Sequence, residues 1–340
     1  MSSYPSLQGK PNVGIAKVPD GRLSALEAIF KPKRKAQAEV SYVDIPGAPE
    51  GHGRTLGVAG ENLEHVQRAD ALLVVARAFD DPAVPHVDDT IDPLRDVETM
   101  LLELNFADLE ILERRLARLA EGSKGAKAPE REALAREQAT LETLRATLEA
   151  GTAIRDQSVT QDEGRMLEGF QLLTAKPLLM VVNASEAQMP EAAALEARLS
   201  SASAGPHVRA AVLCGKLEME LAQMDPAEEL EFRESLGAGE SGLERMIGLS
   251  HQLADLVTFF TGNANEVRAW TVPRGTTALK AAGKVHSDME RGFIRAEVIA
   301  LKDLADIGGS AEARKRGLLR QEGKEYVVDD GDVLNILFSV

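Results

Sequence analysis

The chain has 340 residues, a formal net charge of −15 at pH 7 and a single cysteine, Cys214. The length predicts two or three domains, and the lone cysteine excludes an internal disulfide or a cysteine-based zinc site. The acidic balance argues against a general nucleic-acid coat protein, and no apolar run approaches the roughly 18 residues that span a bilayer. Because the N-terminus also lacks a signal-peptide pattern, the sequence predicts a soluble, cytoplasmic protein with no membrane or DNA partner.

The negative charge is confined to the first three quarters of the chain. Residues 263–340 contain 12 Lys and Arg residues and 12 Asp and Glu residues, so this segment is neutral. The difference predicts a separate C-terminal module that is able to approach an anionic partner.

Four segments of the first three quarters have the near-continuous apolar character of strands that are buried on both faces of a parallel sheet. Helical patterns separate some of them, so the segments predict an α/β domain with ligand-binding loops at the carboxyl ends of its strands. The four segments are AEVSYVDIPG (38–47), ADALLVVARAF (69–79), KPLLMVVNASE (176–186) and VRAAVLCGK (208–216).

The pattern changes between about residues 96 and 164, where leucines recur with spacings of three and four. This register predicts two amphipathic helices, and the Gly-containing segment 121–129 between them predicts an antiparallel hairpin. Two interpretations remain open: a solvated spacer and a partner-binding arm. The leucines are Leu109, Leu112, Leu116 and Leu119 in the first helix and Leu134, Leu141, Leu144 and Leu148 in the second.

A third pattern begins near Val267. The segment 267–299 predicts a strand, a turn, a helix and a second strand, and 323–340 predicts two short strands joined at an Asp-Gly turn. Together they predict a compact β-rich domain. Two interpretations of its basic residues remain open: a face that binds RNA phosphates, and ordinary charged residues exposed to solvent. These residues are Arg291, Arg295, Arg314, Lys315, Arg316 and Arg320.

Two short motifs lie at the ends of predicted strands. In DIPG (44–47), an Asp at a strand end is suited to hold Mg²⁺ through water, and the Gly amide is suited to meet a terminal phosphate, although the same residues are common in simple turns. NASE (183–186) has the spacing of the base-reading motif of GTPases, with Ala in place of Lys and Glu in place of Asp. The longer carboxylate makes adenine a candidate base, and the alternative role of this segment is helix capping.

The order of these pieces resembles the YchF/Obg-like ATPase family over nearly the whole chain. The resemblance implies a P-loop NTPase-like, mostly parallel sheet, an inserted antiparallel helical coiled coil and a C-terminal, β-grasp-like TGS domain. It implies a discontinuous G domain at 1–95 and 165–262, the coiled coil at 96–164 and the TGS domain at 263–340. The segments that carry it are 10–23, 42–47, 69–79, 84–116, 170–186, 216–224, 266–299 and 327–338.

The phosphate-binding loop of that family, GxxxxGK[ST], does not occur in this sequence. The G domain is therefore expected to lack its first strand and P-loop, and to bind Mg·ATP with a dissociation constant above roughly 1 mM. A start site assigned too late, or a deletion, is the expected explanation, and a naturally degenerate member is the alternative.

The resemblance also implies a function. It implies a ribosome-associated ATPase that prefers ATP to GTP and hydrolyses the γ-phosphate with Mg²⁺, with weak or absent activity in this chain because the P-loop is missing. The alternative is a non-catalytic ribosome- or RNA-binding regulatory protein that keeps only the scaffold.

Carrying the family motifs over residue by residue implies a site at the strand ends. For His86, which matches a loop histidine considered for catalysis, the alternative is an exposed loop residue without a role. The implied nucleotide-binding residues are Gly47, Asn183, Glu186, Cys214, Gly215 and Lys216, the implied Mg²⁺ residue is Asp44, and the candidate catalytic residue is His86.

Overall fold

The computed structural model of the protein describes residues 11–45, 61–86, 88, 90–125, 127–203, 205–236 and 240–339. The chain divides into two compact units. The parallel-sheet unit contains Val43–Leu253, and the mixed-sheet unit combines Val13–Tyr42 with Ala254–Val340. None of the helices in the described part of the chain is long and apolar enough to cross a membrane.

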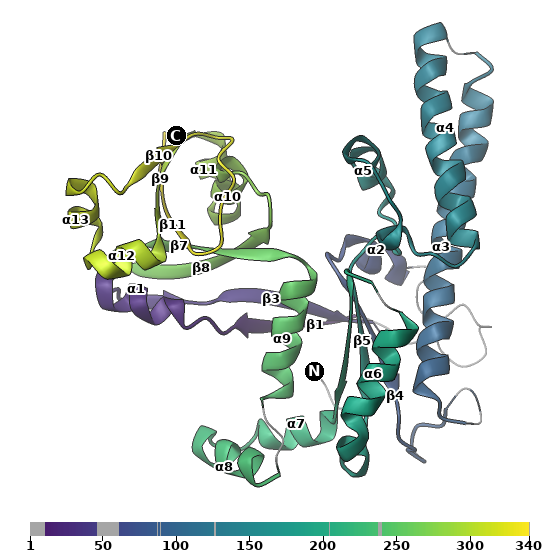
Figure 1. Ribbon diagram of the computed structural model, residues 1–340, viewed down its shortest axis with the longest axis horizontal. Helices are drawn as coiled ribbons and strands as arrows, with labels where there is room; N and C mark the ends of the chain where they lie inside the picture. The colour runs from purple at the N-terminus through teal and green to yellow at the C-terminus, as the bar shows by residue number, and fades with distance from the viewer. Residues whose placement is uncertain are drawn as a thin grey trace. The chain divides into compact units, whose positions relative to one another are not determined.

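Three parallel strands form the sheet of the parallel-sheet unit, in the order β4-β5-β6. Their registers match, so that Arg77, Asn183 and Leu213 lie side by side at the carboxyl ends. The loops that follow therefore start from one edge of the sheet (Figure 1). The strands coincide with three of the predicted segments and are β4 (Leu72–Arg77), β5 (Leu178–Asn183) and β6 (Val208–Leu213).

Helices cover this sheet unevenly. On one face α2, α3 and α6 pack against all three strands, and on the other α9 packs against Leu179 and Val181 of β5. In β4, the residues aligned with these two are Leu73 and Val75, which are 39% and 59% exposed. The prediction that every strand is buried on both faces is therefore wrong for β4, which is an outer strand among the described residues. It is also wrong for the segment 38–47, because β3 (Ala38–Asp44) lies in a separate two-stranded sheet and only its first residue is buried. The covering helices are α2 (Glu61–Arg68), α3 (Pro93–Gly122), α6 (Ala192–Ala202) and α9 (Gly242–Leu253).

The two long helices between β4 and β5 form the predicted hairpin (Figure 1). Helix α3 begins after Asp92, whose side chain accepts hydrogen bonds from two backbone amides of the first turn, and Pro93 occupies a favourable first position. Helix α4 (Ala128–Glu149) packs against it. The leucines predicted to face each other pack in one core, and the most buried of them are Leu112, Leu119, Leu141, Leu144 and Leu148.

A buried carboxylate ties α3 to the segment that leads into β5. The Asp108 side chain accepts the N–H of Leu173 at 2.8 Å and both the N–H and the hydroxyl of Thr174 at 2.7 and 2.6 Å. Burial raises the pKa of Asp108, whereas these three hydrogen bonds favour its charged form. The remaining helices of this unit are α5 (Gln161–Leu167), α7 (Gly215–Leu221) and α8 (Pro226–Leu236), with 3-10 turns η1 (Ile154–Asp156), η2 (Glu168–Phe170) and η3 (Glu186–Glu191).

Six strands form the large sheet of the mixed-sheet unit, in the order β10-β9-β11-β7-β8-β2. Strands β7 and β8 are antiparallel, β11 runs parallel to β7 and antiparallel to β9, and β2 runs parallel to β8. A separate two-stranded sheet pairs β1 (Asn12–Val18) with β3 (Ala38–Asp44). The six strands are β2 (Arg34–Ala36), β7 (Leu256–Gly262), β8 (Glu266–Pro273), β9 (Phe293–Ala300), β10 (Arg320–Glu322) and β11 (Asp332–Phe338).

Helices cover both faces of the six-stranded sheet. Apolar side chains of α10 and α11 pack on one face, and those of α1, α12 and α13 pack on the other. The sheet therefore lies between two helical layers, each with its own apolar core. The helices are α1 (Arg22–Phe30), α10 (Ala278–Val285), α11 (Ser287–Arg291), α12 (Leu301–Ile307) and α13 (Ser310–Lys315).

Helix α1 packs in the mixed-sheet unit. Leu23 and Leu26 of α1 are 2% and 0% exposed and belong to the core that contains Phe260 of β7. The expected division instead places 1–95 in the G domain and starts the TGS domain at 263, after β7. The compact units thus have other bounds than the three expected domains, and the division into domains stays a prediction.

The predicted strand pair around the Asp-Gly turn is wrong in its first strand. Gly331 has a φ of +90°, and β11 follows it, but the partners of β11 are β9 and β7. Before the turn, Val327 makes only an isolated bridge to Thr277. The local pattern indicates a turn followed by a strand, whereas the strand's partners come from distant segments.

Candidate functional site

The predicted base-reading residues come together where β5 and β6 end. The Oδ1 atom of Asn183, the last residue of β5, accepts the backbone N–H of Gly215 at 2.9 Å. Gly215 is the first residue of α7, so Asn183 satisfies an amide that a helix N-terminus leaves without an intrahelical partner. A Cβ at position 215 would stand 3.2 Å from that Oδ1 atom, so glycine is what allows the loops to approach this closely.

The residues next to this contact, Ala184 and Cys214, are buried. Ala184 and Cys214 are 2% and 3% exposed, and the N–H of Ala184 donates to the carbonyl of Leu213 at 2.8 Å. Cys214 is therefore a buried packing residue of the loop, and the exposed polar groups of the site are those of Glu186 and Lys216.

The two charged residues of the candidate site, Glu186 and Lys216, lie close to each other. Glu186 begins η3 and Lys216 lies in the first turn of α7, and their Oε1 and Nζ atoms are 3.5 Å apart. Both side chains are more than half exposed, so the pair stabilises the fold by well under about 1 kcal/mol. Such a weak pair leaves both groups available to exchange partners with a ligand.

The predicted capping role of this segment is also present. Ser185 donates its backbone N–H and its hydroxyl to the Oε1 atom of Gln188, both at 2.9 Å. The Nε2 atom of Gln188 donates to the carbonyl of Ala78, just beyond β4, at 2.6 Å. Sequence reasoning missed Gln188, although its position three residues after a Ser is the signature of a capping box. The capping residues hold the segment in place, and Glu186 projects from it.

The other predicted residues are less closely joined to this group. Asp44 ends β3, a strand of a different sheet from β5 and β6, and its side chain is exposed. Gly47 lies outside the described residues. Among the described residues, no hydrogen bond links Asp44 or His86 to Asn183 or Glu186.

His86 is not simply an exposed loop residue. It lies in the loop between β4 and α3, and its Nε2 atom is 2.8 Å from Oδ2 of Asp96, with both side chains 19% exposed. Arg95 donates to the other carboxylate oxygen of Asp96 at 2.9 Å, and this hydrogen bond raises the pKa of Arg95. Sequence reasoning missed Asp96 and Arg95, because a loop residue and a helical residue ten positions later share no periodic signal.

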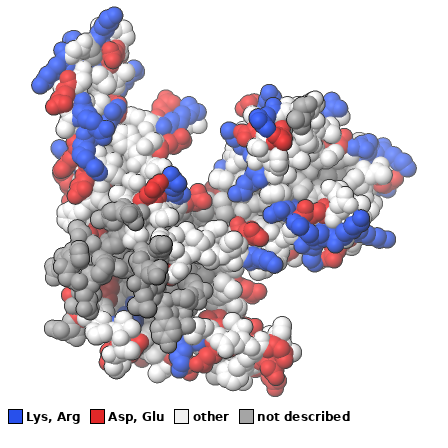
Figure 2. Space-filling view, turned by 180° about the vertical axis from the view of Figure 1, so that it is seen from behind, with Lys and Arg blue, Asp and Glu red and all other residues white. Residues whose placement is uncertain are grey.

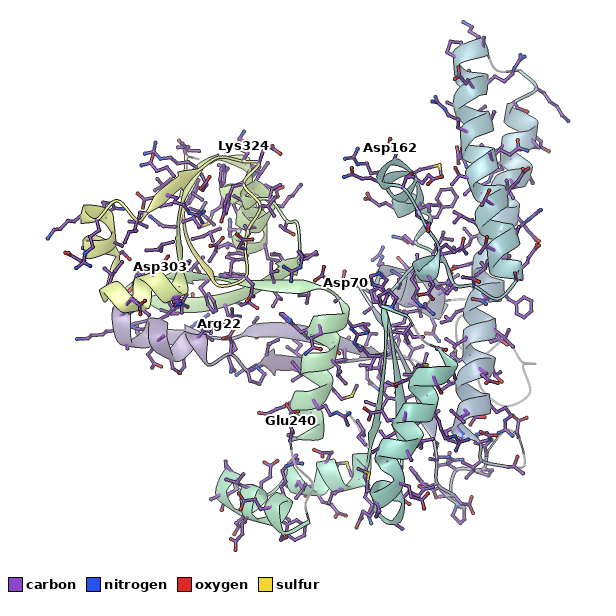
Figure 3. All side chains as sticks on the ribbon, in the orientation of Figure 1. Arg22, Asp70, Asp162, Glu240, Asp303 and Lys324 are labelled. Carbon is purple, nitrogen blue, oxygen red and sulfur yellow. The ribbon has the colours of Figure 1, made fainter. Side chains whose placement is uncertain are left out.

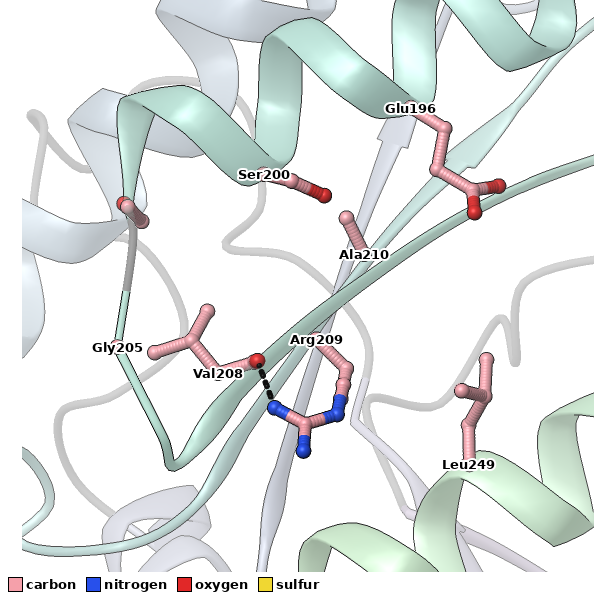
Figure 4. Close-up of a pocket in the computed structure, with 8 residues that line it drawn as sticks. Glu196, Ser200, Gly205, Val208, Arg209, Ala210 and Leu249 are labelled. Carbon is pink, nitrogen blue, oxygen red and sulfur yellow. Dashed lines mark hydrogen bonds between the residues drawn. The ribbon is translucent and has the colours of Figure 1, made fainter.

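A separate hollow of about 400 Å³ lies between α6, β6 and α9 (Figure 4). Arg209 lines it and donates to the carbonyls of Val208 and Pro206 at 2.7 and 3.1 Å. Glu196, also in its lining, accepts from Arg245 at 2.6 Å. The hollow sits where β6 begins, at the opposite end of that strand from Gly215, and contains none of the predicted site residues.

The basic residues predicted for an RNA face lie close to acidic partners. Arg314 binds Glu297 at 2.7 Å, and Arg316 and Lys315 lie 3.0 and 3.8 Å from Glu312. On the face shown in Figure 2, Lys and Arg gather in several groups, with Asp and Glu beside them. The positive charge of this cluster is therefore smaller than the sequence alone indicates.

Comparison with known proteins gives matches over the whole chain. The "Ribosome-binding ATPase YchF" of Bacillus subtilis is 40% identical over 341 residues, which cover 100% of this chain and 92% of that protein. The protein of the same name from Escherichia coli O157:H7 is 35% identical, with the same coverage. The model of the family YchF-GTPase_C, described as "Protein of unknown function (DUF933)", matches residues 256–339.

A solved structure agrees with these relatives. The structure titled "Structure of the Schizosaccharomyces pombe YchF GTPase" has a TM-score of 0.82 and 30% sequence identity, and the match covers 99% of this chain and 90% of that one. Sequence and fold thus agree over nearly the full length. The chain belongs to the YchF family.

Proposed function

We propose that this chain is a ribosome-binding ATPase, with weak ATP binding and hydrolysis because its sequence contains no GxxxxGK[ST] loop, and that it reads the nucleotide base with Asn183 and Glu186. The observation that carries the proposal is the junction of β5 and β6, where Asn183 binds Gly215 at 2.9 Å and Glu186 lies 3.5 Å from Lys216. The names of the curated relatives support ATP and the ribosome as partners. They also favour an enzyme over the non-catalytic alternative.

Base preference follows from the chemistry of residue 186. An exposed carboxylate accepts hydrogen bonds, and adenine offers its exocyclic amino group as a donor. A GTPase reads guanine with a shorter carboxylate and a neighbouring Lys, where this chain has Glu186 and the buried Ala184. We therefore assign ATP as the preferred nucleotide and GTP as the secondary one.

The phosphate end of the nucleotide is assigned to the segment after β3. Asp44 presents an exposed carboxylate at a strand end, and Mg²⁺ typically binds through one or two carboxylates together with water and phosphate oxygens. The donor chemistry of Asp44 thus fits this ion, and Gly47 belongs to the same motif. When bound, Mg²⁺ would neutralise charge on the phosphate oxygens.

The G-domain assignment is supported by the parallel sheet and its outer strand β4. Within the described residues, β4 is an outer strand, and Leu73 and Val75 are exposed on it. We propose that the free side of β4 is the position that a further strand, followed by a P-loop, occupies in a complete P-loop NTPase sheet. The TGS assignment for 263–340 is supported by the mixed sheet of the second unit, and we propose that this unit contributes to the ribosome contact.

His86 is the proposed catalytic residue of the loop after β4. Its ring has both a donor and an acceptor nitrogen when neutral, which suits it to hold and orient an attacking water molecule. In the structure the ring is held by Asp96 and by the backbone of Asp88, so the loop presents it in a defined orientation.

The base assignment is tested by Glu186→Gln with Glu220→Gln as its matched control. Glu220 lies 3.9 Å from the same Lys216 and is equally exposed, but it is outside the base-reading motif. Loss of the carboxylate at 186 should weaken ATP binding by about tenfold and reduce the preference for ATP over GTP, and the control should leave both unchanged. The measurement is competition between ATP and GTP in the presence of Mg²⁺, and equal behaviour of the two variants would contradict the assignment.

Ribosome binding is tested separately by co-sedimentation. The chain should sediment with ribosomes with and without ATP, with different affinities in the two conditions. Absence of sedimentation in both conditions would contradict the partner assignment without affecting the base assignment.

A further inference from the structure

Both ring nitrogens of His86 have partners in the structure. Nε2 lies 2.8 Å from Oδ2 of Asp96, and Nδ1 lies 2.9 Å from the carbonyl oxygen and 3.1 Å from the backbone nitrogen of Asp88. The Asp96 contact comes from another element, the first turn of α3, whereas Asp88 lies in the same loop as His86. The orientation of the ring is therefore set by a residue on a helix.

The Asp96 contact selects one form of the ring. A carboxylate only accepts hydrogen bonds, so Nε2 must carry the proton that it donates to Asp96. In the neutral ring Nδ1 is then the acceptor, and it receives the N–H of Asp88. In the charged ring Nδ1 also carries a proton, which it donates to the carbonyl of Asp88. Asp96 thus keeps the lone pair of the neutral ring at Nδ1, the nitrogen that meets the backbone of Asp88.

Asp96 is itself held in place. Arg95 donates to its Oδ1 atom through Nη2 at 2.9 Å and through Nε at 3.2 Å, which leaves Oδ2 to His86. Arg95 also donates to the hydroxyl and the carbonyl of Thr90, at 2.9 and 2.7 Å. Asp92 caps the same turn through the amides of Leu94 and Arg95. The carboxylate is therefore fixed by the helix that carries it.

A metal ion is the competing explanation for this cluster, since His86, Asp88 and Asp96 bring one ligand atom each within 4.8 Å of one another. The guanidinium of Arg95 lies 2.9 Å from Asp96 and 3.6 Å from Asp88. A cation placed among these ligands would be repelled by Arg95, which already neutralises the carboxylates. The contacts favour a carboxylate–histidine pair over a metal site.

We propose that Asp96 is a positioning residue for His86: it fixes the imidazole with its proton on Nε2 and its lone pair on Nδ1, the nitrogen that would exchange the N–H of Asp88 for the reacting water. The proposal rests on the catalytic role proposed for His86. No proton needs to reach Asp96 in this arrangement, because its task is to orient the ring.

The first test is spectroscopic and needs no nucleotide. Histidine-selective ¹⁵N labelling of the full chain, in alkaline buffer where imidazoles are neutral, reports which ring nitrogen carries the proton, and His86→Gln assigns the signals. The parent should show the Nε2-protonated form. In Asp96→Asn the amide is able to donate to Nε2, so the proton should move partly or fully to Nδ1. Unchanged His86 shifts in Asp96→Asn would overturn the proposal, as would a spectrum of the parent with the proton on Nδ1.

The matched control is Asp92→Asn. It removes the same charge beside the same helical turn, and Asn caps helices as well as Asp, but residue 92 makes no hydrogen bond to His86 in the described part of the chain. Its spectrum should equal that of the parent. Asp96→Glu keeps the carboxylate and should retain the Nε2-protonated form in part. Addition of Zn²⁺ or Mg²⁺ alone should leave the His86 signals in place, and a saturable shift with either ion would favour the metal site instead.

Steady-state ATP hydrolysis separates this inference from the proposed function. Asp96→Asn should lower kcat by about tenfold or more with KM within about twofold, Asp96→Glu should recover part of the loss, and Asp92→Asn should match the parent. If His86→Gln hydrolyses ATP like the parent, the catalytic role of His86 fails, while the ring spectra still decide whether Asp96 sets the form of the ring. Parent-like kcat in Asp96→Asn, together with a loss in His86→Gln, would overturn the positioning role alone.

Discussion

Arg22 and Asp330 are 308 positions apart in the sequence, and their side chains meet at 2.6 Å between Nη1 and Oδ2 (Figure 3 labels Arg22 at the start of α1). Asp330 also accepts the N–H of Thr258 in β7 at 2.8 Å, and the Arg22 guanidinium lies 5.1 Å from the ring centre of Phe260. The N-terminal helix is thus bonded to the sheet built by the last quarter of the chain.

This packing makes α1 a part of the mixed-sheet core. Leu26→Ala removes a side chain that is 0% exposed and should lower the free energy of unfolding by about 2–5 kcal/mol. Leu318→Ala, the same change at a side chain 41% exposed in the same unit, should stay within about 1 kcal/mol of the parent. Urea denaturation measures both, and similar values for the two variants would contradict the burial of α1.

Two Gly→Ala changes in the parallel-sheet unit should have opposite signs. Gly215→Ala places a Cβ 3.2 Å from Oδ1 of Asn183, so it should push this amide away and destabilise the protein by about 1 kcal/mol. Gly248 lies inside α9 with nothing within 4 Å of an added Cβ, so Gly248→Ala should stabilise by about 0.5–1 kcal/mol. Thermal or urea unfolding distinguishes the two variants. Stabilisation by both changes would show that the Asn183 side chain moves aside without a cost in stability.

The fold was predictable wherever a segment's own pattern decides its state. The leucine spacing in 109–148 encodes the hairpin, and the apolar runs encode β4, β5 and β6. What the sequence did not reveal is which sheet a segment joins. Helix α1 lies between two segments expected in the G domain, yet its leucines pack against β7, and such a contact depends on residues far away in the sequence.

The mixed-sheet unit should lose stability at high pH through Tyr326. Its hydroxyl donates to the buried carboxylate of Asp332 at 2.7 Å, and burial together with this hydrogen bond raises the pKa of Tyr326 to about 12. The unfolded chain gives up this proton near pH 10. Because the folded state holds the proton more tightly, this contribution to stability is complete below pH 10 and is lost as the pH rises from about 10 to 12.

The measurement is the free energy of unfolding of the parent and of Tyr326→Phe between about pH 9 and 12. The difference between the two should shrink as the pH rises, because the parent loses a contribution that the variant lacks. A constant difference over this range would contradict the raised pKa.

The C-terminal basic cluster gives a salt-dependent prediction about ribosomes. Arg314 binds Glu297, whose side chain is only 12% exposed. Arg314→Glu would therefore place a second carboxylate beside Glu297 and destabilise the fold. Lys315→Glu with Arg316→Glu is the cleaner variant, since both side chains are more than half exposed. If these residues contact RNA phosphates, co-sedimentation with ribosomes should fall, most clearly at moderate salt.

Lys302→Glu with Lys324→Glu supplies the control for that experiment. It makes the same change in net charge at two other exposed positions of the unit. Equal loss in both double variants would indicate a general charge effect, and no loss in either would place the ribosome contact elsewhere, for example on the helical hairpin.

The candidate site was predictable only in its sequential parts. Asn183 and Glu186 lie within one short motif after an apolar strand, and its spacing together with the family resemblance selected them as candidates. The Asp96–His86 pair joins a loop to a helix and has no such motif. Asp108 did leave a signal, because it is a polar residue in the apolar row formed by Leu104 and Leu112, where a carboxylate is tolerated only with buried hydrogen-bond donors.

The location of α1 also has a consequence for the time at which the protein is able to fold. Leu23 and Leu26 are synthesised early, but the β7 residues that bury them follow roughly 230 residues later. At about 5–20 residues per second, a growing chain keeps this apolar helix without its final partner for about 10–50 s. The hairpin and the strands β4, β5 and β6 are synthesised within that interval, so α1 reaches its final place only after these later segments have been made.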